Sequence, residues 1–197
     1  MVARDIQGQE GDRFSRYQDE YEYLVGSGIT LCVNAITNPR FPLKESEQKN
    51  LMKLYMNDVG MLTSQLYGQN LRPVLADERS INLGAVYESV VAQELRAYGH
   101  HLFYYDNRDK GEVDFLVDDY DTLSALPIEV KSGRSYTVHS ALNNLLSTPE
   151  YNIRQAFVLS NKRIVRKKDK IFYLPVYYIM FINADGLTSQ NEQELLF

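Results

Sequence analysis

Between residues 82 and 182 the hydrophobic residues change from a helical period to a strand period and back, and few folds accommodate this order. The pattern predicts helices at about Asn82–Tyr98 and Val138–Ser147, and strands at Leu102–Asp106, Glu112–Val117, Ile128–Ser132, Gln155–Ser160 and Ile171–Leu174. A last apolar segment runs from Pro175 to Ile182. We therefore expect an α/β fold in which helices flank one mixed sheet.

The residues before this region predict a smaller unit. Apolar residues recur at helical spacing from Phe14 to Val25, and a strand pattern follows over Ile29–Ile36. The polar run 44–50 is expected to be an exposed loop before the apolar segment Leu51–Met56, and a helix is expected over Val59–Tyr67. Residues 69–80 follow neither period. We place the boundary there, with a helix plus wing at 1–70, the main domain at 81–182 and a loose tail at 183–197.

Composition excludes several classes of protein. The net charge of −5 argues against a surface that attracts nucleic acid everywhere, so phosphate binding must be local. The single cysteine, Cys32, cannot form an internal disulfide and favours a reducing, cytoplasmic compartment. No apolar run is long enough for a membrane span, and the first residues lack the apolar core of a signal peptide. Phosphate-loop, HExxH and CxxC motifs are absent, so no ATP site is expected in this chain.

The remaining chemistry lies in two predicted strands. Alternation puts Val113, Phe115 and Val117 on one face of the first strand, with Asp114 opposite. In the second strand it puts Glu129 and Lys131 together on one face. If the strands are neighbours, about 4.8 Å apart, Asp114 and Glu129 can reach one cation.

A Glu-x-Lys triplet alone carries little weight, because Glu47-Gln48-Lys49 also fits it without a strand around it. Glu88 adds independent support, since its neighbours on the predicted helix are apolar or small. A carboxylate that points inward needs a metal, a cation or its own proton. The alternative is a structural ion pair, for example with Lys131 or Arg134.

Three segments resemble a known family. They are SINLGAVYESVVAQELRAYGHHLFYY, KGEVDFLV and PIEVKSGRSYTVHSALNN. They look like the C-terminal domain of a large prokaryotic family of AAA-type ATPases, whose tail has a restriction-endonuclease-like PD-(D/E)xK fold. KNLMKLYMNDVGML resembles the segment just before that domain, and the preceding helix and wing resemble part of its winged-helix region. The resemblance implies an ATPase module in a longer form of the protein.

The resemblance also implies a site. Glu88, Asp114, Glu129 and Lys131 occupy the four signature positions, although Val113 stands where a proline is usual. Asp114 and Glu129 would hold Mg²⁺ or Mn²⁺, with the Val130 carbonyl as a further ligand and Glu88 acting through a water or a second ion. Lys131 would orient or deprotonate the attacking water. Weaker candidates for nucleic-acid contact are Arg134, His139, Asn143, Lys162, Arg163, Arg166, Lys167 and Lys168.

Three functions stay open at this point. The first is a magnesium-dependent DNA endonuclease domain. The second is a non-catalytic module that binds nucleic acid or a partner for the ATPase. The third is a structural dimerisation domain that uses a tyrosine-rich surface, since the chain has 15 Tyr. No membrane partner is expected, and a homo-oligomer is compatible with each function.

Overall fold

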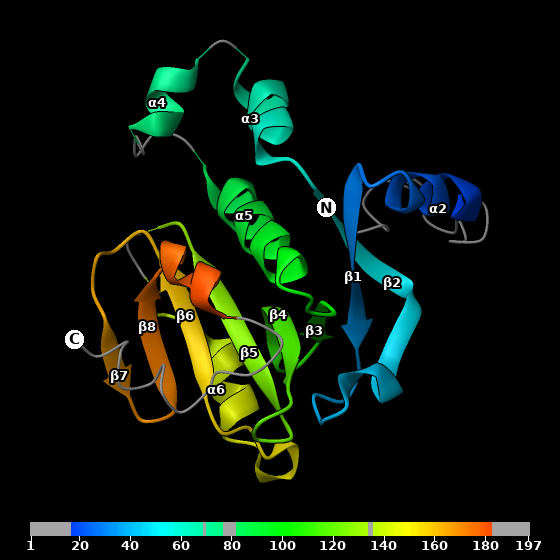
Figure 1. Ribbon diagram of the computed structural model, residues 1–197. Helices are drawn as coiled ribbons and strands as arrows, with labels where there is room; N and C mark the ends of the chain where they lie inside the picture. Colours follow the sequence, from blue (N-terminus) through cyan, green and yellow to red (C-terminus); the bar gives the residue numbers. More distant parts are fainter. Residues whose placement is uncertain (1–16, 69, 77–81, 134–135, 183–197) are drawn as a thin grey trace.

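The computed structural model describes residues 17–68, 70–76, 82–133 and 136–182 (Figure 1). At its centre is one eight-stranded sheet in the order β2-β1-β3-β4-β5-β6-β8-β7. The strands are β1 (Thr30–Ile36), β2 (Glu47–Met56), β3 (Phe103–Asn107), β4 (Gly111–Asp119), β5 (Ser124–Lys131), β6 (Ala156–Ser160), β7 (Arg166–Lys168) and β8 (Ile171–Pro175). Both parallel and antiparallel pairs occur. The expected α/β class, a mixed sheet flanked by helices, is confirmed.

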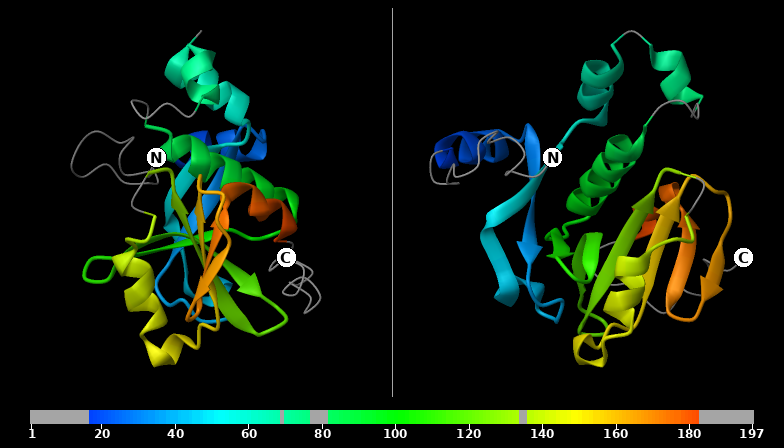
Figure 2. Two further views of the ribbon diagram at one scale, coloured as in Figure 1. Left: turned by 90° about the vertical axis from the view of Figure 1, so that its left-hand side faces the viewer. Right: turned by 180° about the vertical axis from the view of Figure 1, so that it is seen from behind.

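Helices cover both faces of the sheet. The long helix α5 (Gly84–Ala97) and the 3-10 helix η4 (Val176–Phe181) lie on one side, and α6 (Ser140–Leu146) lies on the other, as the left view of Figure 2 shows. Each face has its own hydrophobic core. Val91, Ala92 and Leu95 of α5 pack in one core, and Leu142 and Leu145 of α6 pack in the other.

The two strands expected to form a separate wing belong to the central sheet. β1 pairs antiparallel with β2, and it pairs in parallel with β3 over Asn34–Ile36. The sheet thus continues from residues before the expected domain boundary to residues after it. The helix α2 (Gln18–Gly26) packs on this hairpin through Tyr21, which shares a small core with Met52.

Several segments differ from expectation in detail. The expectation that 44–50 is a loop was wrong, because the 3-10 helix η2 (Leu43–Ser46) leads directly into β2. The triplet Glu47-Gln48-Lys49, expected to lie outside any strand, therefore begins β2. The helix α3 (Val59–Tyr67) has the expected bounds and begins at Asp58, whose side chain accepts a 2.9 Å hydrogen bond from the Met61 N–H. A short helix, α4 (Leu71–Leu75), lies where no period was found. The expected tail, 183–197, lies outside the described residues.

The basic run near the C-terminus contains an edge strand. β7 pairs antiparallel with β8, and Asp169 makes the turn between them with a φ of 54°. A further 3-10 helix, η3 (Pro149–Tyr151), lies between α6 and β6. The basic run therefore belongs to a β-hairpin, with three of its cations on a strand.

An irregularity in β4 changes which residues share a face. Tyr105 is opposite Val113 and Phe103 is opposite Leu116, so β4 uses one residue more than β3 over this stretch. Val113 consequently packs with Leu116 in the core on the α6 side, whereas Phe115 packs in the core on the α5 side. The expectation that Val113 shares a face with Phe115 and Val117 was wrong, because simple alternation does not anticipate a bulge.

Candidate functional site

Asp114 and Glu129 lie side by side on adjacent strands. β4 and β5 pair antiparallel with Phe115 opposite Ile128, and the next residues in this register are Asp114 and Glu129. The Asp114 carboxylate accepts a 2.7 Å hydrogen bond from the backbone N–H of Val130. Because the Asp114 side chain accepts this N–H of β5, it is held against the strand that carries Glu129. The strand pairing on which the sequence argument depended is present.

Glu129 and Lys131 are in direct contact. The Lys131 Nζ donates a 2.6 Å hydrogen bond to Glu129 Oε1. Glu129 is only 5% exposed, and its second oxygen, Oε2, is buried with no hydrogen-bond partner in the described residues. A buried carboxylate oxygen without a donor is unfavourable and is the type of atom that a cation or a water satisfies.

Burial and the surrounding charges make the Asp114 carboxyl group hold a proton tightly. Burial, followed by the charges of Glu129 and Glu88, raises the pKa of Asp114 well above its usual value. The Val130 N–H and the Lys53 ammonium act in the opposite direction but do not outweigh these effects. A divalent cation would remove the repulsion, so the pair of strand carboxylates fits an ion that prefers oxygen ligands.

Lys131 is held in its charged form. Burial acts to lower the pKa of Lys131, but the hydrogen bond and charge of Glu129, together with Asp114 and Glu88, raise it above its usual value. This ammonium group therefore interacts with all three candidate carboxylates. It compensates part of their negative charge.

Glu88 is half-buried, in keeping with its apolar surroundings on α5. Its Oε2 accepts a 2.9 Å hydrogen bond from the hydroxyl of Tyr55 on β2. Burial, followed by the charges of Glu88 and Asp114, raises the pKa of Tyr55. The neutral phenol is thus the donor, and it provides a partner that the ion-pair alternative for Glu88 did not include. Arg134, one partner considered there, lies outside the described residues.

Lys53 is a second residue that sequence reasoning missed. It is 5% exposed, pairs with Glu112 and has its Nζ 4.8 Å from the centre of the Tyr104 ring. Lys53 and Tyr55 are two residues apart on β2, opposite Val33 and Leu31 in the core on the α5 side. The signal was a polar residue at every second position within an apolar strand, but it was hidden because the segment was treated as part of a separate wing.

The candidate residues approach Asp114 from both layers. Ile128 and Val130 pack with α5, so alternation places Glu129 and Lys131 on the α6 side, whereas Glu88 belongs to α5 itself. Across the described ranges, no three His, Cys, Asp or Glu side chains are placed to hold one ion together. The direct ligands on offer are therefore Asp114 and Glu129, with the Val130 carbonyl, and Glu88 acts at longer range.

The weaker candidates for nucleic-acid contact fall into two environments. His139 is buried, with its Nε2 2.8 Å from the Tyr173 hydroxyl. The others that the structure describes are exposed or half-buried: Asn143 on α6, Lys162 and Arg163 before β7, and Arg166, Lys167 and Lys168 on β7. Arg134 again cannot be placed.

Residues 83–179 match a family model described as "Domain of unknown function (DUF4143)". The match covers just under half of the chain. No curated protein and no solved structure matches. The DUF4143 segment runs from the start of α5 into η4 and contains Glu88, Asp114, Glu129 and Lys131, whereas Lys53 and Tyr55 precede it. No helix in the described part of the chain has the length and apolar character needed to cross a membrane.

Proposed function

We propose that this protein is a magnesium-dependent phosphodiester hydrolase, a DNA endonuclease-like domain that works in a reducing, cytoplasmic setting beside an ATPase module of the AAA type. The observation that supports it best is the placement of Asp114 next to Glu129, whose buried Oε2 has no hydrogen-bond partner among the residues that the structure describes and whose Oε1 accepts a hydrogen bond from Lys131. This is the donor set that Mg²⁺ or Mn²⁺ prefers, and an amine lies directly beside it.

Each residue has a distinct role in this proposal. Asp114 and Glu129 would hold the ion with the Val130 carbonyl, and the ion would supply electrostatic stabilisation of the phosphate. Lys131, held by Glu129 in its charged form, orients the attacking water. Glu88 adds negative charge near Asp114, and Tyr55 fixes its carboxylate.

The sheet also places Arg166 on the same face as Glu129. Val158 is opposite Glu129, Tyr173 is opposite Val158, and Arg166 is opposite Tyr173, so these residues form one row across β5, β6, β8 and β7. The Arg166 guanidinium lies 4.9 Å from the centre of the Tyr173 ring, which packs on the α6 side. Three strand spacings separate Arg166 from Glu129, about 14 Å. Val158 and Tyr173 between them are buried in the core, so a nucleic-acid strand would reach Arg166 from its solvent side, not along this row.

Cleavage of labelled single-stranded, duplex and branched DNA with Mg²⁺ or Mn²⁺ tests the proposal. We expect the parent protein to cut at least one substrate, and Asp114→Ala and Lys131→Ala to lose that activity. Lys49→Ala is the matched control, because Lys49 belongs to the exposed triplet Glu47-Gln48-Lys49 and should leave cleavage unchanged. Equal activity in all four preparations would show a contaminating nuclease and would end the proposal.

A non-catalytic nucleic-acid-binding module is the second candidate, because the exposed cations of β7 support it without needing the carboxylates. Binding that persists in Asp114→Ala with no cleavage in any protein would favour it. The dimerisation alternative has less support, since Tyr21, Tyr55, Tyr104, Tyr105 and Tyr173 are buried. An ATPase partner in a longer form of the protein remains part of both proposals.

A further inference from the structure

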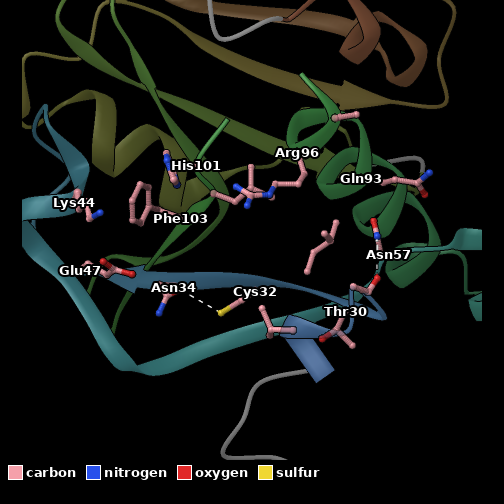
Figure 3. Close-up of a pocket in the computed structure, with 15 residues that line it drawn as sticks. Thr30, Cys32, Asn34, Lys44, Glu47, Asn57, Gln93, Arg96, His101 and Phe103 are labelled. Atoms are coloured by element: carbon pink, nitrogen blue, oxygen red, sulfur yellow. Dashed lines mark hydrogen bonds between the residues drawn. The ribbon is translucent and has the colours of Figure 1, made fainter. Parts of the chain in front are cut away.

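A pocket of about 700 Å³ opens between β1 and the end of α5 (Figure 3). It exists because β1 pairs with β3 only over Asn34–Ile36. β3 begins at Phe103, opposite Asn34, so the preceding part of β1 has no β3 residue beside it. Residues of that part line one side of the pocket, while Gln93, Arg96 and Ala97 of α5 line another. The volume suits a small organic molecule.

Three basic side chains from different segments face this pocket. They are Lys44 of η2, Arg96 of the last turn of α5, and His101, and Figure 3 shows the Arg96 side chain extending between Gln93 and His101. Within the described part of the chain, the Arg96 side chain makes one hydrogen bond, from Nη1 to the His100 carbonyl, and it is long, 3.4 Å. Neither Arg96 nor Lys44 forms an ion pair with a described residue, so their charges are available to a ligand.

The rest of the lining combines apolar side chains, such as Leu31 and Phe103, with polar ones, and it adds little negative charge. Asn34, Asn57 and Gln93 offer amide groups, and Glu47 is the one carboxylate among the described lining residues. Burial, followed by the charge of Glu47, raises the pKa of the Cys32 thiol to about 11, so this group is neutral at pH 7. Its Sγ lies 3.2 Å from Asn34 Oδ1, where it is a weak donor.

We infer that this pocket binds a small organic anion, a phosphate ester or a carboxylate with a hydroxylated body. The guanidinium of Arg96 matches either anion in a bidentate manner, Lys44 adds charge beside it, and His101 offers a ring nitrogen for a hydrogen bond. The amides then suit the hydroxyl groups of the ligand. None of the lining residues belongs to the carboxylate site, so this inference does not depend on the nuclease proposal.

Calorimetric titration with ribose 5-phosphate, citrate and uncharged ribose tests the inference. We expect saturable binding of ribose 5-phosphate or citrate and none of ribose, and the better anion identifies the ligand class. Arg96→Gln should weaken that binding at least about tenfold, because a charge-assisted hydrogen bond is lost. Lys44→Gln should weaken it too, which gives a second variant if the first is poorly folded.

Lys49→Gln removes the same charge from an exposed position of β2 that does not line the pocket, and it should leave binding unchanged. Absence of binding for both anions would overturn the inference. Equal loss in Lys49→Gln and Arg96→Gln would also overturn it, because the attraction would then be general rather than local. The pocket variants should cleave DNA as the parent protein does, so the binding inference and the nuclease proposal can fail separately.

Discussion

The hydroxyl of Tyr55 donates a 2.9 Å hydrogen bond to the carboxylate of Glu88. Tyr55 belongs to the β1–β2 hairpin, and Glu88 belongs to the first helix of the DUF4143 segment. The centre of the Tyr55 ring also lies 5.4 Å from the centre of the Phe115 ring on β4. The buried Tyr55 side chain therefore joins the N-terminal hairpin to the candidate site, so the hairpin does more than extend the sheet.

Removing this hydrogen bond should destabilise the protein. In Tyr55→Phe the packing is kept but Glu88 loses its donor, so we expect a loss of about 1–3 kcal/mol in the free energy of unfolding. Chemical denaturation measures it. Tyr177→Phe is the control, because Tyr177 is 51% exposed and should change stability by less than about 0.5 kcal/mol. A similar loss in both variants would contradict the assigned role of the hydrogen bond.

Lys53 and Glu112 should respond unequally to substitution. Lys53 is almost fully buried, whereas the Glu112 side chain is 38% exposed. Glu112→Gln leaves a buried ammonium without its carboxylate, but Lys53→Met leaves a carboxylate that water can reach. We expect Glu112→Gln to cost about 2–3 kcal/mol and Lys53→Met clearly less. Thermal and chemical unfolding of the two single variants would show the order, and the reverse order would count against a buried pair.

The raised pKa of Asp114 predicts a pH dependence of stability. The folded state binds this proton more tightly than the unfolded chain, whose Asp pKa is about 3.9, so ion-free stability should fall as the pH rises above that value toward the raised one. Asp114→Asn has an uncharged amide in place of the carboxyl group, so its stability should lack this part of the decrease with pH. Added Mg²⁺ should restore stability of the parent at neutral pH, and much less in acid, where protons compete.

Urea unfolding of parent and Asp114→Asn, across pH 4 to 8 with and without Mg²⁺, measures these effects. Identical pH profiles for the two proteins would rule out Asp114 as the source. A parent protein that Mg²⁺ stabilises no more than Asp114→Asn would argue against the proposed ion site.

Gly111 is required at the start of β4. Its φ is +89°, and a Cβ there would lie 2.9 Å from the Cβ of Ala141 on α6. Gly111→Ala should therefore destabilise the fold by at least about 1–2 kcal/mol through backbone strain, with the contact adding to it. Gly133→Ala is the matched control, because no atom lies within 4 Å of its added Cβ. Equal stability of both variants in thermal unfolding would show that the turn adapts.

Arg166 and Lys167 offer a test of which face nucleic acid contacts. Arg166 is opposite Tyr173, which packs on the α6 side with the row that contains Glu129, and Lys167 is opposite Phe172 in the other core. Arg166→Gln should reduce the slope of log affinity against log salt by about 0.7 to 0.9, the value for one phosphate contact. Lys167→Gln removes the same charge and should change it much less. Equal slopes of log affinity against log salt for both variants would contradict nucleic-acid contact on the α6 side of the sheet.

Much of the fold follows from residue periodicity. The bounds of α3 were predicted to the residue, and the strands that carry Asp114 and Glu129 overlap the predicted ones, although β5 begins four residues earlier, at Ser124. That these two strands are neighbours was the condition of the sequence argument, and they pair antiparallel.

Other features depend on contacts between distant segments. The bulge at Asp114 arises from pairing with β3, and no local pattern in GEVDFLV indicates it. The parallel pairing of β1 with β3 joins strands more than sixty residues apart, and it brings Lys53 and Tyr55 to the site. The position of Lys53 within an apolar segment was visible in the sequence, but only the sheet order shows that its partner is Glu112.

The edge strand β7 has a consequence for how copies of this chain meet. An outer strand leaves backbone N–H and C=O groups available to a strand of another molecule, and such edges promote aggregation. Here that edge carries Arg166, Lys167 and Lys168 in succession. Two such edges would bring six like charges together, so electrostatic repulsion opposes pairing of this strand with the same strand of a second copy.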